Sequence, residues 1–149
     1  MQPWIKNICM IWGAESRRIT FGAKLVGMSP DGAVWHFDGL PTRSQTAKLW
    51  KEQEGAVYKA VNQHFEEVRS EEGLIVRRAY ATMRERERRV MVGRFVALAH
   101  WKVACDVLKL SKDSYFNSLQ ICEGVIDAQS VTTEIREQIT GKIRDYARG

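Results

Sequence analysis

Seven arginines concentrated in one short segment are the most unusual chemical feature of this sequence. Residues 77–94 read RRAYATMRERERRVMVGR and hold seven arginines against two glutamates, whereas the complete chain of 149 residues has a net charge of +5. The excess positive charge therefore lies in this segment, where guanidinium groups can bond phosphates in pairs. A solvated helix face carrying Arg–Glu pairs has a similar composition, but two acids are too few to pair seven arginines. The arginines are Arg77, Arg78, Arg84, Arg86, Arg88, Arg89 and Arg94.

A second group of residues, from Lys109 to Ser118, has side chains that can read nucleic-acid bases. An Asn can pair with adenine through two hydrogen bonds, a Ser can bond either base edge, and a Phe can contact a thymine methyl group. Asn117 is the best base-reading candidate, while Lys112 and the helix N-terminus at Ser111 suit phosphate. The candidates for DNA contact are Lys109, Ser111, Lys112, Asp113, Ser114, Phe116, Asn117 and Ser118, together with Arg88, Arg89 and Arg94 of the basic segment.

Catalytic and metal-binding patterns are not found in the sequence. The histidines at positions 36, 64 and 100 are scattered, there is no Gly-rich phosphate loop, and no expected helix carries two His, Asp or Glu at metal-binding spacing. Cys9, Cys105 and Cys122 do not have the paired C-x-x-C spacing of a zinc site. We therefore expect no enzymatic activity, no bound metal and no cofactor.

Two short amphipathic helices joined by a tight turn are expected to position the base-reading residues. Lys109 and Leu110 stand in the turn, where a Gly is common, so that a Lys would adopt a left-handed conformation at a cost of about 1 kcal/mol. Ser111 is placed to cap the second helix by accepting from the backbone N–H of Asp113 or Ser114. The inward residues are Trp101, Ala104, Cys105 and Leu108 in the first helix and Tyr115, Leu119, Cys122 and Ile126 in the second.

This outline predicts a helix-turn-helix. An ordinary pair of antiparallel helices in a bundle has the same apolar spacing, and the neighbouring arginines favour the DNA-binding version. The Arg-rich helix is expected to start at a capping box, Thr82 to Glu85, and to pack beneath the pair. Its inward face comprises Val92, Phe95, Val96 and Ala99.

Helices are also expected in the preceding part of the chain. Apolar residues at spacings of three and four predict a helix from Trp4 to Trp12, ending near Gly13. Residues 24–28 and 33–37 flank a turn sequence and predict a β-hairpin. A long helix should run from Thr42 or Ser44 to about Arg69, and residues 74–81 should form another. The inward residues of the long helix are Ala47, Trp50, Val57, Val61, Phe65 and Val68.

The expected fold is mainly α, with a division of the chain near residue 73. Residues 1–73 would form N-terminal helices with a small β-hairpin, and residues 74–149 a helix-turn-helix followed by a terminal helix. That last helix carries one apolar stripe, of Val131, Ile135, Ile139, Ile143 and Tyr146. The composition, 44% hydrophobic and 28% charged, is that of a globular protein. The lack of a signal peptide or long apolar run, together with three cysteines, predicts a cytoplasmic protein without membrane contact.

The C-terminal half resembles a known transcription module. Arg84-Glu85-Arg86 leading into residues 92–96, followed by a helix-turn-helix with an N-capped second helix, looks like region 4 of sigma factors. Phage late-gene antitermination proteins of the Q type share that module, and Ile11-Trp12-Gly13-Ala14 before Ser16-Arg17-Arg18 is similar to their Trp-Gly opening. Lambda-type members carry a cysteine-based zinc site, so that this chain would belong to a branch without zinc.

The resemblance implies a function in bacteriophage late gene expression, in the cytoplasm of the host cell. Such a protein binds double-stranded DNA near a late promoter, contacts bacterial RNA polymerase with its sigma factor, and obstructs the RNA exit channel so that terminator hairpins cannot form. Two alternatives remain: a helix-turn-helix regulator of repressor or packaging type without polymerase contact, and a protein-interaction module. The residues assigned to polymerase or nascent RNA are Arg17, Arg18, Arg77, Arg78, Arg84 and Arg86.

Overall fold

The structure is a computed structural model that describes residues 1–22, 43–63, 65, 67–130 and 138–142. Its described part is all-helical, which confirms the predicted mainly α class. The predicted β-hairpin lies outside the described residues. The elements are α1 (Pro3–Phe21), α2 (Arg43–Val61), α3 (Glu71–Thr82), α4 (Glu85–Met91), the π-helix η1 (Val92–Val96), α5 (Trp101–Leu108) and α6 (Lys112–Gln129).

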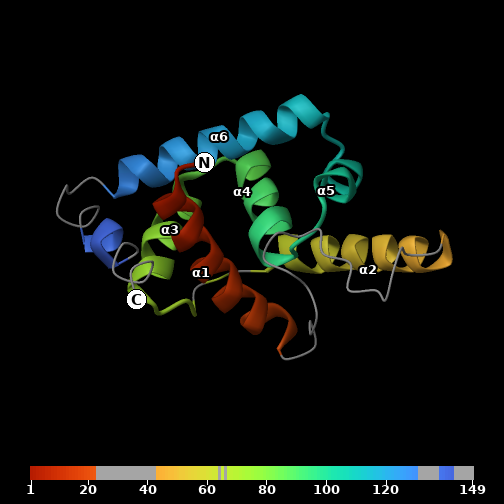
Figure 1. The fold of residues 1–149 in the computed structure, drawn as a ribbon, viewed down its shortest axis with the longest axis horizontal. Coiled ribbons are helices and arrows are strands. Elements are labelled where there is room, and N and C mark those ends of the chain that lie inside the picture. The colour runs from red at the N-terminus through yellow and green to blue at the C-terminus, as the bar shows by residue number, and fades with distance from the viewer. Residues whose placement is uncertain (23–42, 64, 66, 131–137, 143–149) are drawn as a thin grey trace.

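The helices surround a large apolar core, and a second, smaller cluster of Val90, Ala104 and Tyr115 joins α4, α5 and α6. Helix α6 lies along the edge of the molecule (Figure 1). Helix α1 crosses the molecule diagonally and packs on α3 and η1, while α6 packs on α3 and α4. The N-terminus lies beside the middle of α6, where the backbone N–H of Gln2 donates to Glu123 Oε1 at 2.7 Å. Core residues come from both sides of the predicted division near residue 73.

Trp12 is at the centre of the aromatic part of this core. It is fully buried, and its ring centroid lies 5.5 Å from that of Phe65 and 5.4 Å from that of Tyr80. The Trp-Gly pair on which the N-terminal resemblance rests therefore has a packing role in this chain.

Gly13 does not end the first helix, so that this part of the prediction was wrong. Helix α1 continues to Phe21 and buries Ser16 and Thr20 beyond Gly13. A Cβ atom at Gly13 would lie 2.1 Å from the backbone carbonyl oxygen of Phe95. The glycine allows α1 and η1 to approach closely. A Gly is also common at helix ends, so the sequence alone does not distinguish the two roles.

The boundaries of two other helices also differ from the predictions. Helix α2 ends at Val61 and not near Arg69, because the chain turns there and brings Phe65 and Val68 into the core from outside the helix. Ala47, predicted to face inward, is exposed. Helix α3 confirms the helix expected at residues 74–81 and begins after Ser70, whose Oγ accepts from the N–H of Gly73 at 3.0 Å.

The predicted capping box at Thr82 is not formed. Thr82 Oγ1 donates to the carbonyl of Ala79 at 2.8 Å, and Arg84 precedes α4 without a side-chain cap. A Thr hydroxyl at a helix end can bond backward to its own helix, and here it closes α3 instead of opening α4.

The π-helix η1 follows α4 directly and carries the inward face expected of the Arg-rich helix. Val92, Phe95, Val96 and Ala99 are all buried, as predicted. The N–H of Ala97 donates to the carbonyl of Val92 at 2.9 Å, the five-residue spacing of a π-turn. Of the predicted terminal stripe, only Ile139 lies within the described residues, and it is buried.

Candidate nucleic-acid interface

The turn between α5 and α6 has the predicted backbone conformation. Lys109 is left-handed, with φ 58° and ψ 47°, and the N–H of Leu110 donates to the carbonyl of Cys105 at 3.0 Å. Ser111 caps α6 as expected, because its Oγ accepts from the N–H of Ser114 at 3.1 Å. Two local interactions therefore define where α5 ends and α6 begins.

Helix α6 buries one face and leaves the other in solvent. Tyr115, Cys122 and Ile126 are buried, as predicted, and Leu119 is half-buried against the same core. The opposite face is not covered by any other described helix. Its exposed residues include the predicted contacts Lys112, Asp113, Phe116 and Asn117.

Ser118 was wrongly placed on the outer face. Its side chain is 2% exposed, and its Oγ donates to the carbonyl of Ser114 at 2.8 Å. The sequence contained the signal for this, because Ser118 stands three residues after Tyr115 and four before Cys122, on the buried face. Ser114, at the edge of the outer face, is half-buried, and its hydroxyl accepts from Ser111 Oγ at 2.9 Å.

The arginines of α4 have different environments. The guanidinium of Arg88 donates to the carbonyls of Tyr80 and Ala81, at 3.1 and 2.9 Å, and closes the corner between α3 and α4. Arg89 pairs with Glu85 at 2.5 Å one helical turn away. Arg84 and Arg86 are exposed.

Two of these arginines lie beside the turn between α5 and α6. A hollow of about 220 Å³ is lined by Glu85, Arg86 and Arg89 of α4, by Leu108 at the end of α5 and by Leu110 of the turn. The basic segment and the turn thus share one surface region, as the sequence suggested. Of the arginines in that segment, Arg86 and Arg89 are the exposed ones that the structure brings next to the turn, whereas Arg88 is engaged within the fold.

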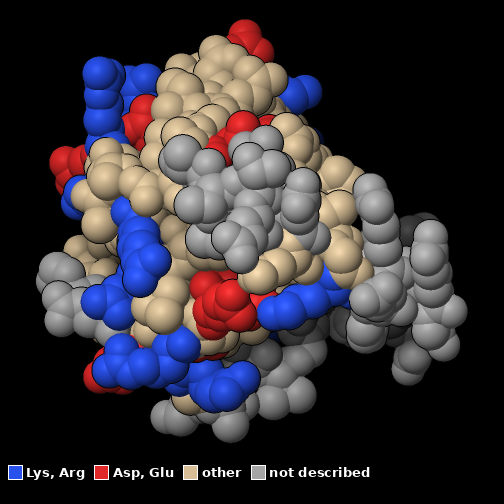
Figure 2. Space-filling view, turned by 90° about the vertical axis from the view of Figure 1, so that its left-hand side faces the viewer, with Lys and Arg blue, Asp and Glu red and all other residues tan. Residues whose placement is uncertain are grey.

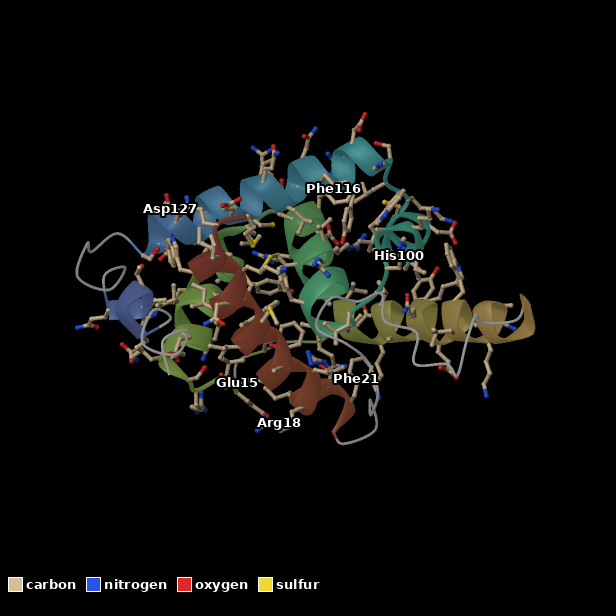
Figure 3. All side chains as sticks on the ribbon, viewed as in Figure 1. Glu15, Arg18, Phe21, His100, Phe116 and Asp127 are labelled. Carbon is tan, nitrogen blue, oxygen red and sulfur yellow. The ribbon has the colours of Figure 1, made fainter. Side chains whose placement is uncertain are left out.

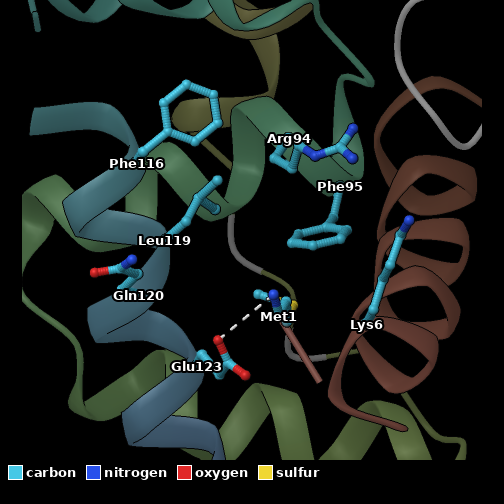
Figure 4. Close-up of a pocket in the computed structure, with 8 residues that line it drawn as sticks. All are labelled: Met1, Lys6, Arg94, Phe95, Phe116, Leu119, Gln120 and Glu123. Atoms are coloured by element: carbon cyan, nitrogen blue, oxygen red, sulfur yellow. Dashed lines mark ion pairs between the residues drawn. The ribbon is translucent and has the colours of Figure 1, made fainter. Parts of the chain in front are cut away.

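Arg94 lies at a second hollow, between α6, η1 and the start of α1 (Figure 4). This hollow has a volume of about 360 Å³, and Arg94 and Lys6 face the α6 residues Phe116 and Gln120 across it. Glu123, on the same side of α6, holds the N-terminus of the chain. Arg94 and Lys6 therefore border α6 at this hollow, whereas the first hollow borders the turn that precedes α6.

The remaining arginine candidates lie away from the outer face of α6. Arg18 is exposed at the C-terminal end of α1, at a distance from the labelled Phe116 in Figure 3. Arg17 is half-buried near Phe95 and Leu98, and burial lowers its pKa. Its Nε has no hydrogen-bond partner among the described residues. Arg77 and Arg78 belong to α3.

Figure 2 views the left-hand side of Figure 1, the side away from α5. On this face several Lys and Arg gather at the lower left, with Asp and Glu beside them.

An aromatic cluster beside the N-terminus of α6 was missed in the sequence. Trp101, predicted to be inward, is half-buried, and its ring lies 6.0 Å from that of Phe116. The ammonium groups of Lys102 and Lys112 lie 5.6 and 5.1 Å from the Trp101 ring centroid. Such cation–π contacts hold two positive charges next to the first turn of α6. The sequence signal for this cluster was Lys102 directly after Trp101, with Lys112 beyond the turn at the start of the next helix.

His100 connects this cluster to α2. Its Nδ1 accepts from the backbone N–H of Lys102 at 3.1 Å and so caps α5. The backbone N–H of His100 donates to Gln53 Oε1 at 3.0 Å. Burial and the charge of Lys102 lower the pKa of His100. The imidazole is therefore neutral at pH 7, as an acceptor of that hydrogen bond must be.

The described residues contain no group of three His, Cys, Asp or Glu that could hold a metal ion. None of the described helices is long and apolar enough to cross a membrane. Comparisons with protein families, curated proteins and solved structures find no match to this chain.

Proposed function

We propose that this protein binds double-stranded DNA through α6 and acts as a phage antitermination factor of the Q type. The observation that carries the DNA-binding part is the uncovered face of α6, with its capped N-terminus beside the Trp101–Lys102–Lys112 cluster. A helix of this kind can enter a major groove with its first turns against the base edges.

The charges around α6 support that arrangement. Phosphates line both walls of a groove, and cations beside an inserted helix can neutralise them. Lys102, Lys109 and Lys112 lie near the start of α6, Arg94 borders α6 at one hollow, and Arg86 borders the preceding turn at the other. The exposed amide of Asn117 would then read an adenine.

The antitermination role rests on the resemblance of residues 84–96 and of the helix-turn-helix to the sigma region-4 module. In this role the protein would load onto sigma-bearing RNA polymerase at a late promoter and block terminator action at the RNA exit channel. Arg18 and Arg78, which are exposed on other elements, are available for polymerase or nascent RNA.

A binding experiment tests the DNA contact. The protein is used to select duplexes from a random library, and affinity for the selected site is then measured by fluorescence anisotropy at several salt concentrations. Asn117→Ala should weaken the selected site by about 1–3 kcal/mol and leave non-specific DNA unchanged. Arg86→Ala should weaken all duplexes and lower the salt slope by about one.

Lys51→Ala is the matched control, because it removes an exposed positive charge from α2. The same loss of affinity in Lys51→Ala and Arg86→Ala would contradict the assigned interface. A purified transcription assay tests the rest: terminator read-through and co-purification with RNA polymerase are expected. Retardation of DNA without either result would leave a plain helix-turn-helix regulator, and absence of duplex binding would refute the DNA-binding proposal.

A further inference from the structure

The outer face of α6 carries no cation beyond its first turn. After Ser114 its exposed residues are uncharged, and two are large and apolar, with Phe116 40% and Ile121 51% exposed. The two acids of this part, Glu123 and Asp127, are half-buried. The exposed residues are Phe116, Asn117, Gln120, Ile121, Gly124, Ala128 and Gln129.

These residue types discriminate between base pairs. Guanine is read chiefly by Arg or Lys, which bond its O6 and N7. Adenine is read by Asn or Gln, and the thymine methyl group by apolar side chains. Asn117 and Gln120 provide two amides and Phe116 and Ile121 two apolar contacts, all on consecutive turns of one exposed face.

Resting on the proposed DNA binding, we infer that α6 reads a run of A·T base pairs in the major groove. Asn117 and Gln120 bond adenine edges, and Phe116 and Ile121 pack on thymine methyl groups. The residues that contact the bases are therefore uncharged, while the cations around them contact the phosphates.

The A·T run is expected to end where the first turn of α6 meets the DNA. The ammonium of Lys112 lies 5.1 Å from the centre of the Trp101 ring, at the N-terminal end of α6. Asp113 is exposed, and a carboxylate can accept from the amino group of cytosine. A G·C pair is therefore expected only at the end of the site that faces Asp113.

Uracil substitution tests the inference without changing the protein. The selected duplex is resynthesised with deoxyuridine in place of thymidine at one position at a time, which removes a single methyl group from the groove. Burying one such group is worth about a fourfold change in affinity, so substitution at the positions under Phe116 or Ile121 should weaken binding by about that factor. Thymidines outside the A·T run should tolerate the change.

Protein variants then assign the contacts. Phe116→Ala and Ile121→Ala should each abolish the effect of uracil at one position, because the side chain that senses the methyl group is gone. Tyr58→Ala is the matched control, since Tyr58 is 56% exposed on α2 and should leave every uracil effect in place.

The outcomes separate this inference from the proposed function. A selected site with G·C pairs at its centre would overturn the inference while leaving DNA binding intact. Equal affinity for thymidine and deoxyuridine probes, with Asn117→Ala still impaired, would do the same. Failure to select or bind any duplex would refute the DNA binding itself, and a partner protein would then be the occupant of this face.

Discussion

Replacing Gly13 by Ala tests the close contact between α1 and η1. The added Cβ would lie 2.1 Å from the carbonyl oxygen of Phe95, 2.8 Å from its carbonyl carbon and 3.0 Å from its Cβ. The first distance is about 1.2 Å short of a usual carbon–oxygen contact of about 3.3 Å. Two of these atoms are backbone, so that no rotamer change can relieve the overlap and η1 itself must move.

The magnitude follows from two opposing effects. Ala is favoured over Gly within a helix by about 1 kcal/mol. Overpacking of a core typically costs about 1–3 kcal/mol, and a clash with backbone belongs at the upper end. We therefore expect Gly13→Ala to lower the free energy of unfolding by about 2 kcal/mol.

Gly55→Ala provides the matched control. Gly55 lies inside α2, and a Cβ there would meet nothing within 4 Å, so that only the propensity gain of about 1 kcal/mol remains. Urea unfolding followed by circular dichroism measures the stability of both variants. The urea midpoint should shift while the dependence of the unfolding free energy on urea concentration stays unchanged. A Gly13→Ala variant as stable as Gly55→Ala would refute the close packing of α1 on η1.

Three further substitutions have definite expected outcomes. Lys109→Gly should stabilise the protein by up to about 1 kcal/mol in urea unfolding, because Lys109 has φ 58°, yet should weaken DNA binding if this lysine contacts phosphate. Tyr115→Phe should leave the protein equally stable or more stable by about 1 kcal/mol, because the buried hydroxyl has no hydrogen-bond partner in the described part of the chain. Burial also raises the pKa of Tyr115 to about 12, and a large loss of stability in urea unfolding would contradict this environment. The lowered pKa of His100 means that the unfolded chain binds the proton more readily, so that stability should fall as the pH drops below about 6.5. His100→Asn, which retains a capping side chain, should show a smaller fall in melting temperature between pH 7.5 and pH 5.5 than the unsubstituted protein.

Features that depend on a few neighbouring residues were predicted from the sequence. The left-handed Lys109, the Ser111 cap and the buried stripe of α6 each follow from residues within one or two helical turns. Hydrogen bonds and side-chain directions in helices are local, so that such patterns determine them wherever the helix lies in the fold.

Features that depend on the meeting of distant segments were decided by the tertiary structure. Gly13 faces a carbonyl more than 80 residues away, Arg88 bonds the carbonyls that end α3, and Trp101 stacks near Phe116 across the turn. The spacing of a residue in its own helix shows which face it occupies but not which helix will pack against that face. The sequence by itself therefore determined α5, the turn and α6 with its buried stripe, and tertiary packing decided which cations and aromatic side chains lie beside them.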